Sequence, residues 1–434
     1  MTQESVSPAT RIDGEVNVPG DKSISHRALI LGSLASGRTY IGNASPAADV
    51  LATAACLRAC GAWVRDFPPA RYAVDGAGPG VSLRSPDGVL DCANSGTTMR
   101  LLAGALAGCD CEATLDGDES LRRRPMMRVV DPLRAMGAGI DASPQGTAPL
   151  RVRGHRSLEG VTWRSPVASA QVKSAILLAG LSADRPTTVV EPVATRDHTE
   201  RMLRMCGVDV VSTGAEVTVH PGPLEPFGLR VPGDLSSAAF FLALAASRPG
   251  WRVRCPGVGL NPGRTGMLAV LEAMGAAVRV EEGDPAGGVE PVGDVEVLGT
   301  RLRGVTISGS LTVRCIDELP IIAVLASQAN GDTEIRDAGE LRNKESDRIA
   351  ILETGLRLLG VACESSADGL TVHGPVRLRA ARLNAAGDHR FAMAWAIAAA
   401  LVPEGGGESI IDGADAAVVS YPGFFSDLGM LLSS

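Results

Sequence analysis

The chain has 434 residues, of which 45% are hydrophobic, 21% charged and 3% aromatic, and its formal net charge is −8. This composition is typical of a globular protein, and the length exceeds what one hydrophobic core usually serves. The negative charge and the scarcity of aromatic residues argue against nucleic acid as a partner, but a local basic cleft for a small anion is compatible with them.

The nine cysteines include no Cys-x-x-Cys motif and no zinc-finger spacing, so we interpret them as reduced, mostly buried thiols. Residues 1–6 are polar and lack the apolar run of a signal peptide. The longest apolar run, 391–402, is too short to span a membrane and predicts a buried helix. We therefore expect a cytoplasmic protein with no membrane partner.

A short pattern recurs along the chain: a large apolar residue, three further residues, a glycine, and then a β-prone stretch such as 277–280. The pattern is typical of a helix that ends at a glycine in left-handed backbone. The glycines are Gly61, Gly137, Gly207, Gly275, Gly360 and, in a degraded copy, Gly429. Helix-like apolar runs occupy 27–34, 99–106, 175–181, 238–246, 319–326 and 391–401. A spacing of roughly 70 residues predicts six α/β units.

The sequence Val18-Pro19-Gly20-Asp21 recurs as Val231-Pro232-Gly233-Asp234, about half a chain later, and serines and an apolar helix follow each copy. This coarser duplication predicts two lobes of three units, with an active site between them. The segment 281–293 is rich in Gly, Glu, Asp and Pro, and we interpret it as a surface loop without a functional role.

Candidate functional residues stand at the starts of the predicted helices. In the segment 19–27, Lys22 and Arg27 accompany a glycine turn and a serine-capped helix start, which suits an anion. Both cations oppose the helix dipole, so each needs a compensating negative charge or ligand. The alternative interpretation is a capped surface helix. Asn94-Ser95-Gly96-Thr97 has a similar form, although ordinary turns share it and it is not a P-loop.

Two further segments of the first half are polar. Arg122-Arg123-Arg124 form a basic cluster that is notable in an acidic protein, although three arginines before a proline are usually a solvated loop. Ser169 and Gln171 precede an apolar helix and can hydrogen-bond a polyol or a phosphate, but a plain helix cap explains them equally well.

In the second half, Asp317-Glu318 precede a buried helix as capping residues or as a general base. Lys344 and Arg348 would share one helix face, with surface ion pairs as the alternative. Gly387-Asp388-His389-Arg390 open the most apolar helix. If the helix starts converge, they form a site for a polyanion, with Asp317 and Glu345 as acid and base candidates.

These segments, in this order, resemble the 5-enolpyruvylshikimate-3-phosphate synthase family. The matching motifs are 20–27, 94–97, 124–126, 344–348 and 388–390, and the segments 166–175 and 195–200 look like its bacterial class II branch. The resemblance implies a two-lobed inside-out α/β barrel of the enolpyruvyl transferase type, with six βαβαββ units. It implies an N-terminal lobe at 21–232, a discontinuous C-terminal lobe at 1–20 plus 233–434, and an active site in the cleft between the lobes.

The resemblance also implies the reaction: transfer of the enolpyruvyl group of phosphoenolpyruvate to the 5-hydroxyl of shikimate 3-phosphate, by addition and elimination, in a cytoplasmic monomer without cofactor or metal. Asp317 would take the hydroxyl proton, and Glu345, with Lys22, would protonate the methylene carbon. The implied shikimate 3-phosphate ligands are Lys22, Ser23, Arg27, Ser169, Ala170, Gln171, Arg196, Asp317 and Lys344. The implied phosphoenolpyruvate ligands are Lys22, Asn94, Gly96, Arg124, Gln171, Arg348, His389 and Arg390.

Two positions bear on ligand specificity. Val419-Ser420-Tyr421-Pro422 stands where class I members of the family carry Lys-Thr-Phe-Pro, so one phosphate contact is missing. In the family a methyl group at the position of Gly96 obstructs the inhibitor glyphosate, so this chain is expected to be sensitive to it.

The nearest rival is the sister family of UDP-N-acetylglucosamine enolpyruvyl transferases. Its members begin with Lys-Asn where this chain has Lys22-Ser23, and they carry a loop cysteine that none of the nine cysteines matches. A non-catalytic binding protein is the other alternative, and the presence of Lys22, Asp317, Glu345 and Arg390 argues against it.

Overall fold

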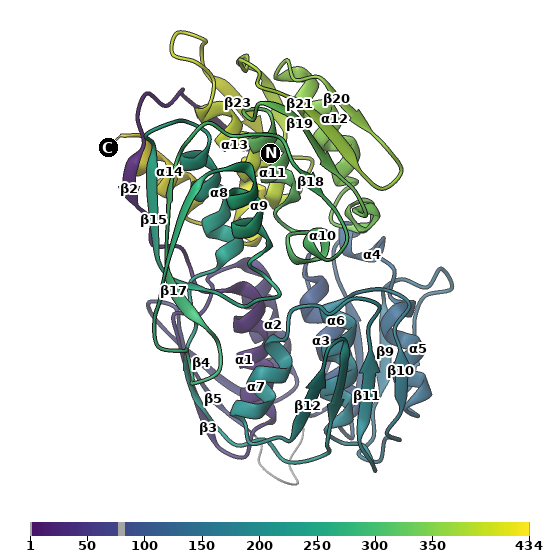
Figure 1. The fold of residues 1–434 in the computed structure, drawn as a ribbon. Helices are drawn as coiled ribbons and strands as arrows, with labels where there is room; N and C mark the ends of the chain where they lie inside the picture. Colours follow the sequence, from purple (N-terminus) through teal and green to yellow (C-terminus); the bar gives the residue numbers. More distant parts are fainter. Residues whose placement is uncertain (1, 77–82, 434) are drawn as a thin grey trace. The chain divides into compact units, whose positions relative to one another are not determined.

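The computed structural model describes residues 2–76 and 83–433 (Figure 1). The chain divides into two compact units. The N-terminal unit comprises Gly20–Val231 and Pro285–Glu290, and the C-terminal unit comprises Met1–Pro19, Pro232–Asp284 and Pro291–Ser434. Both main boundaries lie inside the repeated Val-Pro-Gly-Asp motif. The units differ from the lobes expected from the sequence by one residue at each motif and by the segment 285–290.

The described part of the N-terminal unit contains three four-stranded sheets. Their strands are β3 Arg38–Gly42, β4 Trp63–Phe67, β5 Arg71–Asp75, β6 Leu90–Asp91, β7 Glu112–Asp116, β8 Gly139–Asp141, β9 Leu150–Arg153, β10 Thr162–Arg164, β11 Thr187–Val190, β12 Val210–Thr213, β13 Glu216–Val219 and β14 Gly228–Arg230. The strand orders are β14-β3-β5-β4, β6-β7-β9-β8 and β10-β11-β13-β12. In each sheet the first pair is parallel and the other two pairs are antiparallel, as one βαβαββ unit requires.

The C-terminal unit repeats this arrangement. Its strands are β1 Gln3–Val6, β2 Asp13–Glu15, β15 Arg252–Gly259, β16 Ala277–Glu282, β17 Val292–Leu298, β18 Thr306–Ile307, β19 Gly331–Ile335, β20 Cys363–Ser365, β21 Leu370–Gly374, β22 Arg382–Asn384 and β23 Ser409–Asp412. The sheets are β2-β15-β17-β16, β18-β19-β21-β20 and, in the described residues, a three-stranded β22-β23-β1. In the last sheet β1 pairs antiparallel with β23 in place of a closing hairpin. The expected six α/β units, three in each compact unit, are confirmed.

The first helix of each repeat forms the core of its unit. These helices are α1 Lys22–Leu34, α3 Gly96–Ala107, α6 Ala170–Gly180, α8 Leu235–Ala246, α11 Leu319–Ala326 and α13 His389–Ala400. They contain the six apolar runs of the sequence, and every residue of α8, α11 and α13 is buried, because helices that are apolar all round must be enclosed. Figure 1 shows α1 and α3 between the strands β3–β5 and β9–β11 of the N-terminal unit.

The second helix of each repeat buries one face only. These helices are α2 Ala48–Ala59, α5 Met127–Ala135, α7 His198–Met205, α9 Gly266–Met274, α12 Arg348–Leu358 and α14 Phe424–Leu432. Shorter helical turns are α4 Glu119–Arg122, α10 Ser310–Arg314, η1 Gly339–Asn343 and η2 Ala414–Val419.

The repeated glycine has the backbone that the sequence pattern predicts. Gly61, Gly137, Gly207, Gly275 and Gly360 all have positive φ, between 82° and 95°, and all follow helices. The prediction is wrong for the degraded copy, because Gly429 lies inside α14, which continues to Leu432. A left-handed residue is needed only where the helix ends.

The segment 281–293 is mainly the exposed connection between β16 and β17, as its composition suggested. Residues 285–290 pack in the N-terminal unit, and Glu290 is only 1% exposed. Its Oε1 lies 2.7 Å from Nδ1 of His198, and Arg201 donates to the carbonyl oxygen of Val289 at 2.8 Å. The surface-loop prediction is therefore confirmed for most of the segment, and Glu290 is a buried exception because His198, distant in sequence, contacts its carboxylate.

The cysteines and the apolar run behave as expected. All nine cysteines are buried and unpaired, and burial raises the pKa of Cys60 and of Cys206 to about 12. The run 391–402 lies within and just after the buried helix α13. Within residues 2–76 and 83–433 no helix is long and apolar enough to cross a membrane.

Candidate active site

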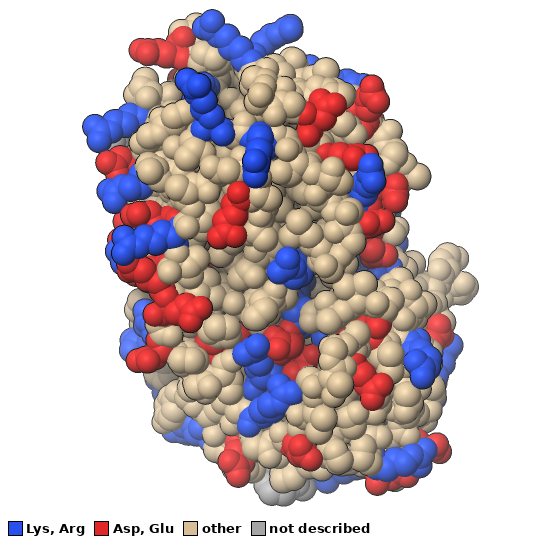
Figure 2. All heavy atoms as spheres, in the orientation of Figure 1, with Lys and Arg blue, Asp and Glu red and all other residues tan. Residues whose placement is uncertain are grey.

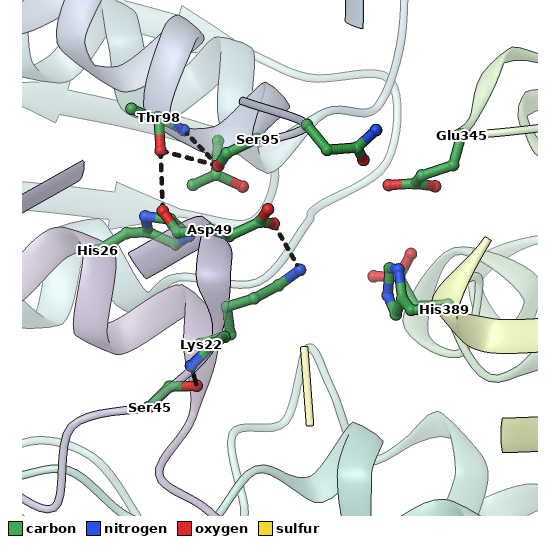
Figure 3. A network of polar contacts seen from close by, with 12 residues as sticks. Lys22, His26, Ser45, Asp49, Ser95, Thr98, Glu345 and His389 are labelled. Carbon is green, nitrogen blue, oxygen red and sulfur yellow. Dashed lines mark hydrogen bonds and ion pairs between the residues drawn. The ribbon is translucent and has the colours of Figure 1, made fainter. Parts of the chain in front are cut away.

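Lys22 begins α1 and has an acidic partner. The helix starts here because Oδ1 of Asp21 accepts a hydrogen bond from the backbone N–H of Ile24 at 2.8 Å. The Lys22 ammonium opposes the helix dipole, and Asp49, in the first turn of α2, offsets it: Nζ and Oδ2 lie 2.8 Å apart. Figure 3 shows the Lys22 side chain directed toward Asp49. The compensation that the sequence required is therefore an ion pair.

Arg27 lies one turn further along α1 and is 3% exposed. Its Nε donates to Oγ1 of Thr199 and its Nη2 to Oγ of Ser174, both at 2.7 Å, while Nη1 donates to the carbonyl oxygen of Ser23 at 2.9 Å. Burial and the nearby Arg196, from the segment before α7, lower the pKa of Arg27 to about 10. A bound anion would relieve both costs, so the guanidinium suits an anionic ligand.

Gln171 connects α6 to α3. Its Oε1 accepts from Nη1 of Arg100 at 2.6 Å, and its Nε2 donates to Oγ1 of Thr97 at 2.9 Å. Ser169 is the N-cap of α6, accepting from the backbone N–H of Val172 at 3.5 Å, so the capping interpretation applies to it. Ala170 is the first residue of that helix.

Arg100 was missed by the sequence analysis as a candidate, although it is 8% exposed and contacts Gln171. Its one sequence signal is its place about one turn inside α3, which matches the place of Arg27 in α1. That signal becomes visible only once the helix starts are known.

Arg124 is the one buried arginine of the cluster 122–124, at 7% exposure. Its Nη2 donates to Oδ1 of Asn94 at 3.0 Å, and Nδ2 of Asn94 donates to Oδ2 of Asp118 at 2.8 Å. Arg122 and Arg123 are exposed and pair with nearby carboxylates, so the solvated-loop interpretation holds for those two.

The lack of a side chain at Gly96 allows two arginine side chains to lie close to it. A Cβ added to it would lie 2.8 Å from Nη1 of Arg100 and 3.1 Å from Nη1 of Arg124. Any larger residue here must therefore displace at least one guanidinium.

A buried chain of hydroxyl groups runs beneath these residues (Figure 3). Oγ1 of Thr98 lies 2.8 Å from Oγ of Ser95 and 2.7 Å from Oγ1 of Thr53, which lies 2.7 Å from Nδ1 of His26. Burial, Lys22 and Arg27 hold the pKa of His26 well below its ordinary value of 6.5. The chain ties α3 to α2 and α1, and Arg27 and Gln171 complete the links to α6 and α7.

The N-terminal halves of five helices in the N-terminal unit are thus joined by hydrogen bonds. We call this group the N-terminal cluster: Lys22, Ser23, Arg27, Asn94, Gly96, Arg100, Arg124, Ser169, Ala170, Gln171 and Arg196. Positive helix ends and five cations favour a bound polyanion.

In the C-terminal unit, Arg348 opens α12 and is 1% exposed. Its Nε donates to Oδ2 of Asp388 at 2.8 Å and its Nη2 to Oε2 of Glu345 at 2.6 Å, while Nη1 lies 3.7 Å from Oδ1 of Asp317. Burial opposes the charge of Arg348, but these three carboxylates outweigh it and raise the pKa of the guanidinium. The surface-ion-pair alternative is therefore wrong for Arg348.

Lys344 and Arg348 do not share a helix face, as the sequence spacing suggested. Lys344 follows η1 in extended backbone, and α12 begins only at Arg348 because Asp347 caps it. The two cations meet instead at Asp317, whose Oδ1 lies 3.2 Å from Nζ of Lys344. Asp317 and Glu345 keep 17% and 15% of their side chains exposed, so both can reach a ligand.

The start of α13 supplies Asp388, His389 and Arg390, all buried. Oδ1 of Asp388 accepts from the backbone N–H of Arg390 at 2.9 Å, and Nδ1 of His389 lies 3.9 Å from the same oxygen. Arg390 donates through Nη1 to the carbonyl oxygen of Ser236 at 3.4 Å and lies 6.0 Å from the ring centroid of Phe240.

Two arginines here carry buried donors. Nη1 of Arg348 and Nε of Arg390 have no hydrogen-bond partner within the described residues. A buried donor without a hydrogen bond is costly, so each of these groups suits a further acceptor; Oδ1 of Asp317 gives Nη1 of Arg348 an ion pair at 3.7 Å but no hydrogen bond. We call Asp317, Lys344, Glu345, Arg348, Asp388, His389 and Arg390 the C-terminal cluster.

Arg264 was also missed by the sequence analysis. Its Nη2 donates to Oγ of Ser236 at 2.5 Å and to Oδ1 of Asp234 at 3.0 Å, and Ser236 donates to Glu318. Burial raises the pKa of Glu318, although Arg264 and Arg390 oppose the shift. No motif surrounds Arg264 in the sequence, so only the folded chain shows it.

The two clusters contain the residues that the family resemblance implied, whereas the other candidates Arg122, Arg123 and Glu318 lie outside them. In the part of the chain that the structure describes, no three His, Cys, Asp or Glu side chains gather in a way that could hold a metal ion. Positive helix ends, buried guanidinium groups and partly exposed carboxylates are parts suited to proton transfer on an anionic substrate.

Comparisons with known proteins agree with this chemistry. The family model for EPSP synthase (3-phosphoshikimate 1-carboxyvinyltransferase) matches residues 6–428. A 3-phosphoshikimate 1-carboxyvinyltransferase of Chloroflexus aurantiacus is 49% identical over 428 residues, 97% of each chain, and that of Roseiflexus sp. is 49% identical over 98% of each chain.

Solved structures show the same relationship. EPSP synthase from Acinetobacter baumannii has a TM-score of 0.87 and 37% identity, covering 99% of this chain and 98% of its own. The enolpyruvyl transferase NikO from Streptomyces tendae, at 19% identity and a TM-score of 0.78, shares the fold. The chain belongs to the EPSP synthase family, the 3-phosphoshikimate 1-carboxyvinyltransferases of the shikimate pathway.

Proposed function

We propose that both clusters act on one pair of substrates, phosphoenolpyruvate and shikimate 3-phosphate, and assign the residues of each as follows. The observation that carries the proposal is the pair of buried, unsatisfied donors on Arg348 and Arg390, next to the partly exposed carboxylates of Asp317 and Glu345. These groups provide anion binding and proton transfer side by side.

The N-terminal cluster binds shikimate 3-phosphate. Ser169 and Ala170 open α6, whose free N–H groups and dipole favour the 3-phosphate. Arg27 and Arg196 offset its charge, and Gln171 and Ser23 provide hydrogen-bonding groups. From the C-terminal cluster, Lys344 and Asp317 bind the hydroxyl face of the same substrate.

Phosphoenolpyruvate is bound by arginines of both clusters. Arg124, oriented by Asn94, and the unsatisfied donors of Arg348 and Arg390 bind its phosphate and carboxylate, because guanidinium groups match both anions. Lys22, Gln171 and His389 complete the set. Gly96 keeps the space near Arg124 open for the ligand.

The reaction is an addition followed by an elimination. Asp317 takes the proton of the 5-hydroxyl while the oxygen bonds to C2 of phosphoenolpyruvate, and Glu345, assisted by Lys22, delivers a proton to the methylene carbon. The product is a tetrahedral ketal phosphate. Loss of a proton from the new methyl group then expels inorganic phosphate and restores the enol ether. The cations stabilise negative charge on phosphate throughout.

Phosphate release tests the proposal. Release that requires both phosphoenolpyruvate and shikimate 3-phosphate, and that persists in EDTA, supports it. Release with UDP-N-acetylglucosamine in place of shikimate 3-phosphate would assign the sister reaction instead. No release with either acceptor would favour a binding protein.

Three finer assignments belong to the same proposal. The absence of a side chain at Gly96, where a Cβ would crowd Arg100 and Arg124, supports inhibition by glyphosate in competition with phosphoenolpyruvate, and full activity in millimolar glyphosate at low phosphoenolpyruvate would refute it. A cytoplasmic monomer is the expected state; sedimentation of the purified protein and cell fractionation test it. Val419 offers no cation in place of the class I lysine, so the phosphate depends on the arginines above.

A further inference from the structure

One sheet of the six has an unusual outer face. On β14-β3-β5-β4, the strand registers place Arg38, Asp75 and Trp63 in one row, Tyr40, Ala73 and Arg65 in the next, and Gly42, Arg71 and Phe67 in the third. Tyr40, Trp63 and Phe67 are 59%, 44% and 38% exposed. In a chain with 3% aromatic residues, three exposed rings on one sheet need an explanation.

The outer faces of other sheets carry paired charges beside single exposed aliphatic residues such as Val211, Val280 and Leu298. Arg252 lies between Asp13 and Glu296 on one, Arg151 pairs with Glu112 on another, and Arg382 pairs with Asp412 on a third. Figure 2 shows basic and acidic side chains mixed in small groups over the face in view. Mutual neutralisation is therefore the usual state of an outer sheet face in this protein.

Arg71, on the outer face of the sheet β14-β3-β5-β4, is an exception to this pairing of charges. Its Nη2 donates to the carbonyl oxygen of Pro68 at 2.9 Å, but among the described residues no carboxylate lies within ion-pair distance of it. Arg65 lies over the Phe67 ring, 4.9 Å from its centroid, and likewise has no acidic partner in that part of the chain. This side of the sheet is therefore both aromatic and positively charged.

A hollow of about 370 Å³ opens beside Arg71, lined by Tyr40, Ile41, Gly42, Phe67, Arg71 and Tyr72. Gly42 has space around it, because a Cβ added there would have its nearest neighbours, the Arg230 Cα and the Leu229 carbonyl oxygen, at 4.0 Å. The volume lies at the lower end of small-molecule sites, roughly 300–1,000 Å³.

We propose that this hollow binds a small planar aromatic carboxylate, with its ring against Tyr40 and Phe67 and its carboxylate on Arg71. Exposed rings favour a flat aromatic partner, and a guanidinium without an acidic partner favours a carboxylate, which it can bind through two parallel hydrogen bonds. The site is built entirely from β3, β4, β5 and the turn between the last two. It is separate from both clusters and independent of the function proposed above.

The test uses benzoate as the probe and isothermal titration calorimetry on the full chain. Cyclohexanecarboxylate, which has the charge without the flat ring, and benzyl alcohol, which has the ring without the charge, are the ligand controls. The proposal predicts that benzoate binds more tightly than either. Equal binding of cyclohexanecarboxylate, or no benzoate binding at millimolar concentration, would overturn it.

Variants locate the site. Gly42→Val places a side chain in the hollow without a steric clash, and Arg71→Gln removes the guanidinium charge. Each substitution should weaken benzoate binding by about tenfold or more while leaving phosphate release unchanged. The matched control is Arg151→Gln on β9, the equivalent strand of the next sheet, which should bind benzoate as the wild type does. If both pocket variants bind benzoate with wild-type affinity, the ligand lies elsewhere and the proposal fails.

Discussion

The ammonium Nζ of Lys22 and the carboxylate Oδ2 of Asp49 lie 2.8 Å apart, and Asp49 is 6% exposed. This pair fixes a cation at the start of α1, where the helix dipole alone would repel it. Lys22 is assigned to both substrates and to proton delivery, so its position should control turnover.

We therefore predict that Asp49→Asn lowers kcat/KM for phosphate release by roughly 10- to 100-fold, because a misplaced catalytic group costs about that much. Asp49→Glu, which keeps the charge, should recover part of the loss. Steady-state kinetics of the three proteins, with circular dichroism to confirm folding, provide the check. Wild-type kinetics in a folded Asp49→Asn protein would show that the ion pair is only structural.

Gly96→Ala should separate the substrate from the inhibitor. Its methyl group would meet Nη1 of Arg100 at 2.8 Å and Nη1 of Arg124 at 3.1 Å, so one guanidinium must shift. We expect the KM for phosphoenolpyruvate to rise by several-fold and the inhibition constant of glyphosate to rise by roughly tenfold more.

Gly228→Ala is the matched control for this substitution, because nothing lies within 4 Å of the added Cβ. Competition kinetics with glyphosate on the three proteins make the comparison. An unchanged ratio of the two constants in Gly96→Ala would remove Gly96 from the phosphoenolpyruvate site.

His26 should make the fold sensitive to acid. Its pKa is held well below 6.5, so below about pH 6.5 the unfolded chain takes up a proton that the folded chain does not. Stability from this group is thus fully present above pH 6.5 and is lost as the pH falls, by at most about 1.4 kcal/mol per pH unit.

Urea unfolding between pH 5 and 7 measures this dependence. The slope of unfolding free energy against pH should be shallower in His26→Gln than in the wild type. His155→Gln, at a histidine that is only half-buried, should keep the wild-type slope. Identical slopes for wild type and His26→Gln would contradict the account of the buried chain.

The pair His198 and Glu290 should stabilise the N-terminal unit. Both side chains are at most 2% exposed, and Glu290→Ala removes the carboxylate oxygen that lies 2.7 Å from Nδ1 of the buried His198. We expect Glu290→Ala to lower the unfolding free energy by roughly 1–3 kcal/mol.

Glu281→Ala, at an exposed residue of the same hairpin, should cost less than about 0.5 kcal/mol. The unfolding free energies of the two variants, measured with denaturant, test this expectation. Equal small losses would mean that residues 285–290 are held by other contacts.

The fold was predictable from the sequence where its signals are local. A helix that ends at a left-handed glycine leaves its mark within a few residues, so Gly61 and Gly275 were found, and Gly429 failed because its helix continues. The candidate site motifs likewise stand at helix starts, where a cap and a charge lie close together in the sequence.

What the sequence could not provide is burial between distant segments. Arg100 and Arg264 have no distinctive neighbours in the chain, and only packing turns them into members of polar networks. Glu290 looked like part of a solvated loop because His198 lies 92 residues away. Lys344 and Arg348 were placed on one helix because Asp347, a residue type that favours the N-cap, was not recognised as the start of α12.

The most direct test of the proposed mechanism is the single-turnover rate of phosphate release in Asp317→Asn, with binding of shikimate 3-phosphate measured in parallel. Asn keeps the shape but cannot accept the hydroxyl proton, so the rate should fall by about 100-fold or more while the substrate still binds. Asp332→Asn, at an exposed aspartate, should react as the wild type does. An Asp317→Asn protein that binds the substrate and releases phosphate at the wild-type rate would contradict the assignment of Asp317 as the base.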